Sequence, residues 1–250
     1  MKDGFIKVAA GTPDVQVADC EFNATEIIKM VREMEAEGAR VMVFPELCIT
    51  AYTCGDLFWQ ENLLEEAKVQ LMRIAEETAD VDAIIFVGLP LEYKGKLYNV
   101  AAGLNHGEIL GFVPKTYLPN YNEFYEARYF TSGEDVDGTV TIRRSEYGLH
   151  HDEEMTDEDV EFGLEAEVEA LEEEDSFEEL EEIDEEPDYI DEDETEEFDE
   201  VDVPISSNIL FICQEMPKLK IAAEICEDLW TAAPPSSQLA LNGAKVIFNL

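Results

Sequence analysis

The stretch VMVFPELC, residues 41–48, contains the pattern on which our fold assignment depends. Its four leading apolar residues are typical of a strand buried in a sheet. Pro45 cannot donate a ladder hydrogen bond and ends the run, and the acidic Glu46 follows directly. In layered α/β folds, side chains that leave the sheet at strand ends gather in a cleft, which makes Glu46 a candidate site residue.

Helix and strand patterns alternate on both sides of this stretch. Asn23 and Glu26 form a capping-box pattern ahead of apolar residues at helical spacing, and Gly38 stands where that helix should stop. We expect an α/β layered domain with antiparallel hairpins among its strands. The predicted helices are at 23–37, 61–78 and 234–244, and the strand-like runs are 5–10, 41–44, 83–89, 97–104, 108–113, 208–213, 219–225 and 245–250.

The acidic residues are distributed very unevenly. The chain has 60 acidic and 16 basic residues, and residues 151–200 hold 30 of the acidic residues and no Lys or Arg. Residues 151–202 are too charged to bury enough apolar surface, so we expect a disordered acidic insertion between 1–150 and 203–250. Its sparse Phe, Leu, Ile and Tyr residues leave partner binding as an alternative. If it loops out, residues 141–144 and 204–211 should lie near each other.

Charge and cysteine content limit the function classes. An acidic surface repels phosphate backbones, so no nucleic-acid partner is expected. No apolar run approaches the roughly 20 residues that span a bilayer, and the N-terminus lacks a signal-peptide apolar core. Five cysteines without a tight spacing pattern argue against a disulfide framework and for a reducing compartment. We therefore expect a cytoplasmic protein with no membrane contact.

Nucleotide and metal motifs are weak or missing in the sequence. It has no G-x-G-x-x-G and no P-loop, so we expect no cofactor in this segment. His150 and His151 are adjacent, point apart on a strand and lack ligand spacing, so we expect no metal site there. His106 is interpreted as a turn residue between two strands.

Two further polar residues share the position of Glu46. Lys115 follows EILGFVP, and Cys226 follows LKIAAEI, so all three come just after strand-like runs. Each alone has a second interpretation: Glu46 as a surface cap, Lys115 as a solvent-exposed lysine and Cys226 as a small packed side chain. Cys54 is a rival nucleophile, but no strand-like run precedes it directly, and we expect it to be packed.

The three residue types suit cysteine-dependent amide hydrolysis. A thiolate attacks a carbonyl well, but a free thiol is mostly protonated near neutral pH. A nearby glutamate can take the thiol proton, and a nearby lysine can stabilise both the thiolate and the oxyanion. The product of attack would be a thioester that water then hydrolyses.

Three segments carry a resemblance to a known family. FPELCITAYTCGDLF (44–58), PKTYLPNYNEFYEARYF (114–130) and AAEICEDLW (222–230) resemble the catalytic segments of the nitrilase, or carbon–nitrogen hydrolase, superfamily. That resemblance implies an α-β-β-α sandwich with a Glu-Lys-Cys triad. In their detailed sequence, these segments are similar to the glutaminase domain of glutamine-dependent NAD synthetases. The resemblance covers 1–135 and about 203–250.

The resemblance implies a role for seven residues. Glu46 would be the general base, Lys115 the stabiliser of oxyanion and thiolate, and Cys226 the nucleophile. Glu126 would support the lysine, with an exposed acid on a helix as the alternative. The glutamine-binding residues implied are Tyr52, Tyr121 and Glu227.

The resemblance also implies a larger enzyme. Family members use ATP and Mg²⁺ in a synthetase domain that amidates deamido-NAD with ammonia from glutamine, and superfamily members commonly form homo-oligomers. The family continues beyond the point that corresponds to Leu250, so we expect this chain to be a C-terminally truncated sandwich. The alternatives are another nitrilase-type amidase, and a catalytically inactive fragment or acidic interaction protein.

Overall fold

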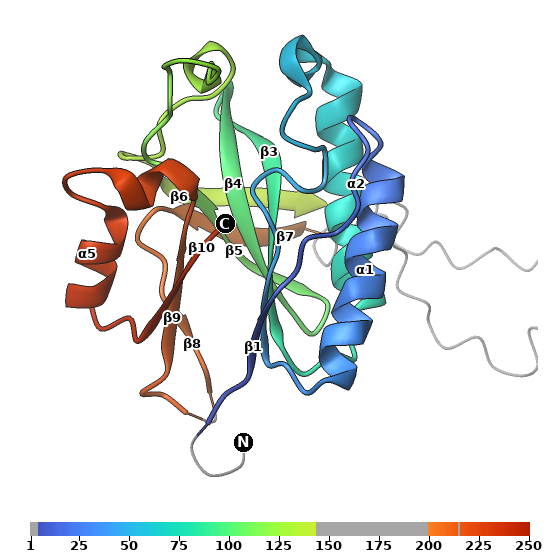
Figure 1. Ribbon diagram of the computed structural model, residues 1–250, viewed down its shortest axis with the longest axis vertical. Coiled ribbons are helices and arrows are strands. Elements are labelled where there is room, and N and C mark those ends of the chain that lie inside the picture. The colour runs from blue at the N-terminus through green and yellow to red at the C-terminus, as the bar shows by residue number, and fades with distance from the viewer. Residues whose placement is uncertain (1–4, 144–199, 215) are drawn as a thin grey trace, which may run out of the picture. The chain divides into compact units, whose positions relative to one another are not determined.

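A computed structural model describes residues 5–143, 200–214 and 216–250 (Figure 1). Residues 1–142 and 201–250 belong to one unit. Its helices are α1 (Cys20–Ala36), α2 (Glu61–Glu77) and α5 (Pro235–Leu241), with 3-10 turns η1 (Gly55–Trp59), η2 (Glu126–Arg128) and η5 (Cys226–Trp230). The described strands are β1 (Val8–Ala10), β2 (Val41–Val43), β3 (Ile84–Tyr93), β4 (Lys96–Asn105), β5 (Glu108–Pro114), β6 (Asp137–Arg143), β7 (Glu200–Ser206), β8 (Phe211–Ile212), β9 (Lys220–Glu224) and β10 (Val246–Asn249).

The described strands form two sheets. The larger sheet has the order β1-β2-β3-β4-β5-β7-β6, and the smaller has the order β10-β9-β8. The first three strands are parallel, β3, β4 and β5 form an antiparallel meander, and β7 pairs parallel to β5. Since two successive reversals restore direction, β2 and β5 run the same way and end at the same edge of the sheet.

The sheets pack face to face, and helices cover their outer faces (Figure 1). The core between them joins Val41, Phe86 and Val113 of the larger sheet to Phe211 and Ile221 of the smaller. The rings of Phe86 and Phe211 meet edge to face, with centroids 5.1 Å apart. Helices α1 and α2 lie on the larger sheet, and α5 lies beside β9 (Figure 1). The predicted α-β-β-α sandwich is therefore confirmed.

The start of α1 differs from the sequence prediction. Asp19 is the N-cap residue, and its Oδ1 accepts a hydrogen bond from the Phe22 N–H at 3.0 Å. Asn23 is fully buried within the helix, where its Nδ2 donates to the carbonyls of Gln16 at 2.8 Å and Ile49 at 2.9 Å. The predicted capping box was wrong because the Asn23 amide binds distant loops instead of its own helix end. The predicted stop is confirmed, since α1 ends just before Gly38, which has a φ of 83°.

The acidic segment falls largely outside the described residues. The prediction of disorder for 151–202 and the prediction about His150 and His151 concern that part of the chain. Strand β7 begins at Glu200, so the last three residues of the expected insertion are in a strand. Strands β6 and β7 are neighbours in the sheet, and Thr141 donates to Asp202 at 2.8 Å. The chain on either side of the segment therefore comes together as expected.

No helix in the described ranges combines the length and the apolar character needed to cross a bilayer.

Candidate active site

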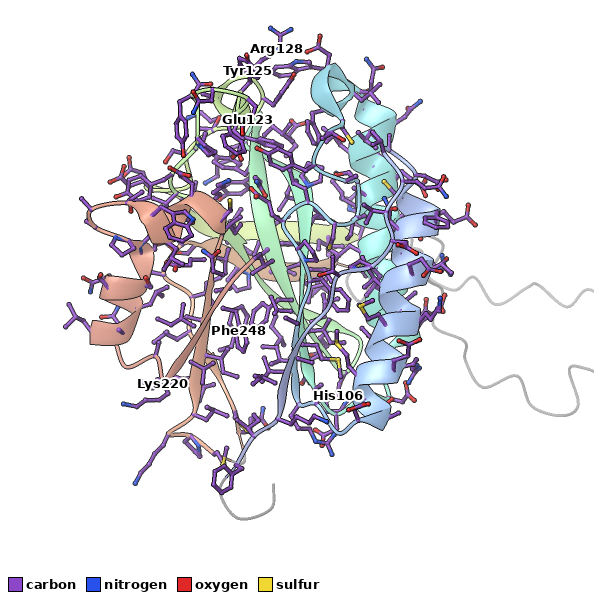
Figure 2. The ribbon with its side chains drawn as sticks, in the orientation of Figure 1. His106, Glu123, Tyr125, Arg128, Lys220 and Phe248 are labelled. Carbon is purple, nitrogen blue, oxygen red and sulfur yellow. The ribbon has the colours of Figure 1, made fainter. Side chains whose placement is uncertain are left out.

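The three strand-end residues come together at one end of the sandwich. Glu46 follows β2, Lys115 follows β5, and Cys226 follows β9. The loop that carries Tyr125 and Arg128 lies at this end, whereas His106, in the β4–β5 turn, lies at the opposite end (Figure 2). The parallel direction of β2 and β5 therefore places an acid and a base side by side, although 69 residues separate them in the chain.

Lys115 lies between two carboxylates. Its side chain is fully buried, and its Nζ is 2.6 Å from Glu46 Oε1 and 2.7 Å from Glu126 Oε1. Glu126, in η2, is itself 3% exposed. Both alternatives from the sequence are thereby overturned, because Lys115 is not in solvent and Glu126 is not an exposed acid.

The charges in this cluster support one another. Burial alone would lower the pKa of Lys115, but the charges of Glu46 and Glu126 outweigh burial and raise it. Lys115 is therefore a cation at neutral pH. Burial, followed by the charge of Glu46, raises the pKa of the Glu126 carboxyl, and Lys115 opposes that rise. The carboxylates of Glu46 and Glu126 thus share one buried cation, Lys115.

Cys226 begins η5 and faces this cluster. Its φ of 43° is unusual for a residue with a side chain, and its N–H donates to the Leu250 carbonyl at 3.0 Å. Burial, followed by the charge of Glu46, raises the pKa of the Cys226 thiol to about 11, and Lys115 opposes that rise. The thiol is therefore protonated at neutral pH, and a base must accept its proton before it attacks.

A buried aspartate that our sequence analysis did not select connects the two segments. Asp228 is 2% exposed, and its Oδ1 accepts from the N–H groups of Thr116 at 3.1 Å and Tyr117 at 2.7 Å. Its Oδ2 accepts from the Ile225 N–H at 3.1 Å. The chain after Lys115 is thereby fixed to the chain on both sides of Cys226. Burial raises the pKa of Asp228 to about 6. Its position two residues after Cys226 was the available clue.

Asn99, on β4, is a second residue that the sequence analysis missed. It is 1% exposed, and its Nδ2 donates to Glu46 Oε1 at 2.5 Å. A polar residue in the middle of the apolar run LYNVAA was the available signal.

The loop of Glu46 is held by close backbone packing. Leu47, the next residue, has a φ of 53°. Gly88 on β3 lies against this loop, and a Cβ at Gly88 would be 2.4 Å from the Leu47 N and 2.8 Å from the Pro45 O. Only glycine allows the loop to approach β3 this closely.

Three residues expected to bind glutamine occupy two different environments. The Tyr52 hydroxyl donates to Glu126 Oε1 at 2.8 Å, beside the buried cluster. The Tyr121 hydroxyl donates to the Glu227 carboxylate at 2.9 and 3.0 Å, and Tyr121 is 51% exposed. Within the described residues, Glu227 has no cationic partner.

Cys54 and His106, the other residues considered for a chemical role, lie in a packed position and in a turn. Cys54 is buried, and its thiol donates to the carbonyls of Thr50 at 3.0 Å and Ala51 at 3.3 Å. His106 has a φ of 49° in the β4–β5 turn, as expected. The part of the chain that the structure describes contains no cluster of three or more His, Cys, Asp or Glu side chains suited to a metal ion.

Comparison with known proteins gives one consistent result. The carbon–nitrogen hydrolase family model matches residues 7–250. Glutamine-dependent NAD(+) synthetases of Mycobacterium tuberculosis and Mycobacterium leprae are 30% and 29% identical to this chain over 247 residues, which are 99% of it and 28% of each relative. The synthetase of Aquifex aeolicus is 40% identical over 119 residues, 48% of this chain and 21% of that protein.

Solved structures agree on the fold. The crystal structure of a glutamine-dependent NAD(+) synthetase from Cytophaga hutchinsonii superposes with a TM-score of 0.63 at 22% identity, over 98% of this chain and 30% of that one. This chain thus spans less than a third of the length of these larger proteins. The family match covers nearly the whole sequence, and the chain belongs to the carbon–nitrogen hydrolase family.

Proposed function

We propose that this chain hydrolyses the side-chain amide of glutamine with Glu46, Lys115 and Cys226 as its catalytic residues. The observation that carries the proposal is the buried Lys115, in contact with Glu46 and Glu126 and beside the Cys226 thiol. A buried cation held by two acids next to a thiol suits a reaction in which negative charge develops on a carbonyl oxygen.

The first half of the proposed reaction forms a thioester. Glu46 accepts the thiol proton as the Cys226 sulfur attacks the amide carbon, and the carbonyl π electrons move onto oxygen. Lys115 stabilises that oxyanion. When the oxyanion collapses, the C–N bond breaks, the nitrogen takes the proton from Glu46, and ammonia leaves.

The second half regenerates the enzyme. Glu46 accepts a proton from water as the water oxygen attacks the thioester carbon. The C–S bond then breaks, the sulfur recovers the proton, and glutamate is released. Glu126 contributes by holding Lys115, and no cofactor in this segment is needed for either half.

In the proposed recognition of glutamine, the Glu227 carboxylate binds the amino group. Glu227 accepts hydrogen bonds from the Tyr121 hydroxyl and meets no cation among the described residues, so it would bind the cationic amino group of glutamine. Tyr52 would line the same pocket from the side of Glu126.

Similarity to glutamine-dependent NAD(+) synthetases supports a role within a larger protein. In that proposal, the released ammonia serves the ATP- and Mg²⁺-dependent amidation of deamido-NAD by residues outside this chain. Glutamine would be the partner of this chain, and the larger enzyme would form a homo-oligomer.

The decisive experiment measures glutamate release from glutamine by the purified chain, by Cys226→Ala and by Cys54→Ala. We expect release from the wild type and from Cys54→Ala, whose thiol is packed against carbonyls, and none from Cys226→Ala. A folded wild type that releases no more glutamate than Cys226→Ala would refute the proposal. Release of ammonia from other amides but not from glutamine would indicate another nitrilase-type amidase.

A further inference from the structure

Asn99 contacts both proposed catalytic residues of the larger sheet. Its side-chain Nδ2 donates to Glu46 Oε1 at 2.5 Å, and its backbone carbonyl accepts from the Lys115 N–H at 2.8 Å. It lies on the central strand β4, opposite Pro90 of β3, and is 1% exposed. One residue of a buried strand therefore contacts both the Glu46 carboxylate and the Lys115 backbone.

The two donors on Glu46 bind the same oxygen. Lys115 Nζ lies 2.6 Å from Oε1, and Asn99 Nδ2 donates to that same atom. A carboxylate has two oxygens, and an oxygen that accepts two strong donors is poorly placed to take a third proton. We propose that Asn99 is a positioning residue that holds Oε1 of Glu46, so that Oε2 faces the Cys226 thiol and acts as the base. This inference rests on the proposed function.

The other end of the Asn99 amide supports a positioning role. Its Oδ1 is buried and has no hydrogen-bond partner among the described residues. Rotating the amide by half a turn would bring this oxygen against Glu46 Oε1, where two acceptors repel, so the observed orientation is fixed by Glu46. A buried acceptor without a partner lowers stability, so packing alone does not account for an amide at this position.

The first test uses a variant of similar shape without the donor. We expect Asn99→Leu to lower kcat for glutamine hydrolysis about tenfold or more, a part of what a general base contributes, with KM within twofold. Its Tm should not fall, because the unpartnered Oδ1 is removed as well. Asn99→Asp, of the same shape but without the donor, should lose kcat at least as strongly.

A matched control lies on the same strand. Asn105, also on β4, donates through its side chain to the Ala83 carbonyl at 2.9 Å, at the far end from the site. We expect Asn105→Leu to leave kcat unchanged. Equal losses of kcat in Asn105→Leu and Asn99→Leu would overturn the proposal, as would a loss in Asn99→Leu that appears only as a higher KM or a lower Tm.

A second readout does not depend on turnover. The rate of Cys226 alkylation by iodoacetamide at pH 8, followed by peptide mass spectrometry, reports how firmly the thiol keeps its proton. If Glu46 turns away in Asn99→Leu, the thiol loses its neighbouring negative charge and alkylation should accelerate at least threefold. In a Glu46→Gln background the same substitution should have no effect, because the two changes act through one carboxylate.

Different results would refute the proposed function and the positioning role of Asn99. Absence of glutamate release from the wild type would refute the proposed function, while the alkylation cycle would still decide the role of Asn99. An alkylation rate that Asn99→Leu leaves unchanged, or changes equally with and without Glu46, would overturn the positioning role.

Discussion

The site contains two tyrosine–glutamate pairs in opposite environments. Tyr52 donates to Glu126 at 2.8 Å, and Tyr121 donates to Glu227 at 2.9 and 3.0 Å. Glu126 of the first pair is buried and also binds Lys115, and Tyr52 is half-buried. Tyr121 of the second pair is half exposed, and Glu227 meets no cation in the part of the chain described.

From this difference we infer that the Tyr52–Glu126 pair belongs to the structural framework of the site. The Tyr121–Glu227 pair belongs to the surface that recognises the ligand. A buried carboxylate needs partners inside the protein, and Glu126 has them in Lys115 and Tyr52. Glu227 is half-buried and meets no cation among the described residues, so it keeps its capacity for a ligand's cation. Changes in the first pair should therefore alter folding and kcat, and changes in the second should alter KM.

Removal of the shared cation should have the largest effect. In Lys115→Met two carboxylates stay buried without a counterion, so we expect a loss of about 3–5 kcal/mol in the free energy of unfolding and no measurable glutamate release. Urea denaturation measures the first quantity. Lys29→Met, which removes a surface ion pair, is the matched control and should leave stability unchanged. A Lys115→Met chain as stable as the wild type would refute the framework role.

Asp228 is a buried carboxyl group with no directly bound cation among the described residues. It therefore tests the effect of burial by itself. The structure supplies it with backbone N–H donors, and burial raises its pKa from 3.8 to about 6. A carboxyl whose pKa is higher in the folded state stabilises the fold below pH 4, and that contribution is lost as pH rises through 6. A rise of the pKa from 3.8 to about 6 corresponds to about 3 kcal/mol at most.

The comparison that isolates this effect is between wild type and Asp228→Asn. We expect the wild type to lose stability relative to the variant between pH 4 and pH 7, as measured by urea denaturation at each pH. The amide cannot ionise, so it provides the flat reference. A stability difference that is constant across this range would contradict the assignment.

Gly88 tests the packing that holds Glu46 within the framework. In Gly88→Ala the new methyl group would overlap the backbone of Pro45 and Leu47, so we expect a loss of about 1–3 kcal/mol and a large fall in kcat. Gly11→Ala is the control, because there the methyl group meets side-chain atoms and no backbone: the movable ends of two methionines, and the ring of Phe44 at 3.0 Å. If both variants keep full activity, the close approach at Gly88 does not position Glu46.

The smallest effect should come from the Tyr121–Glu227 pair. We expect Tyr121→Phe to raise KM for glutamine about two- to fivefold with kcat unchanged, because it removes only one hydrogen bond to Glu227. Tyr52→Phe should instead lower stability by about 1 kcal/mol, since it leaves Glu126 one donor short in a buried site. Steady-state kinetics and urea denaturation of both variants make the comparison direct. Interchanged results would reverse the roles assigned to the two pairs.

The sequence by itself predicted most of the elements and the proposed catalytic residues. Apolar runs that end at Pro45 and Pro114 identified strands with Glu46 and Lys115 at their ends, because strand burial depends on local apolar patterning. The family resemblance added Glu126, Tyr52, Tyr121 and Glu227. The helix start at Asn23 was wrong, because a capping pattern does not show that the amide has stronger partners elsewhere in the chain.

Only the tertiary structure decided which polar residues are buried and what they contact. Local sequence does not distinguish a solvent-exposed Lys115 from one enclosed by Glu46 and Glu126, since those contacts join residues 69 and 11 positions apart. Asp228 and Asn99 escaped notice for the same reason. Their significance lies in contacts with distant segments. The N–H donors of Asp228 come near it when the two sheets pack, and the Glu46 carboxylate comes near Asn99 when the larger sheet forms.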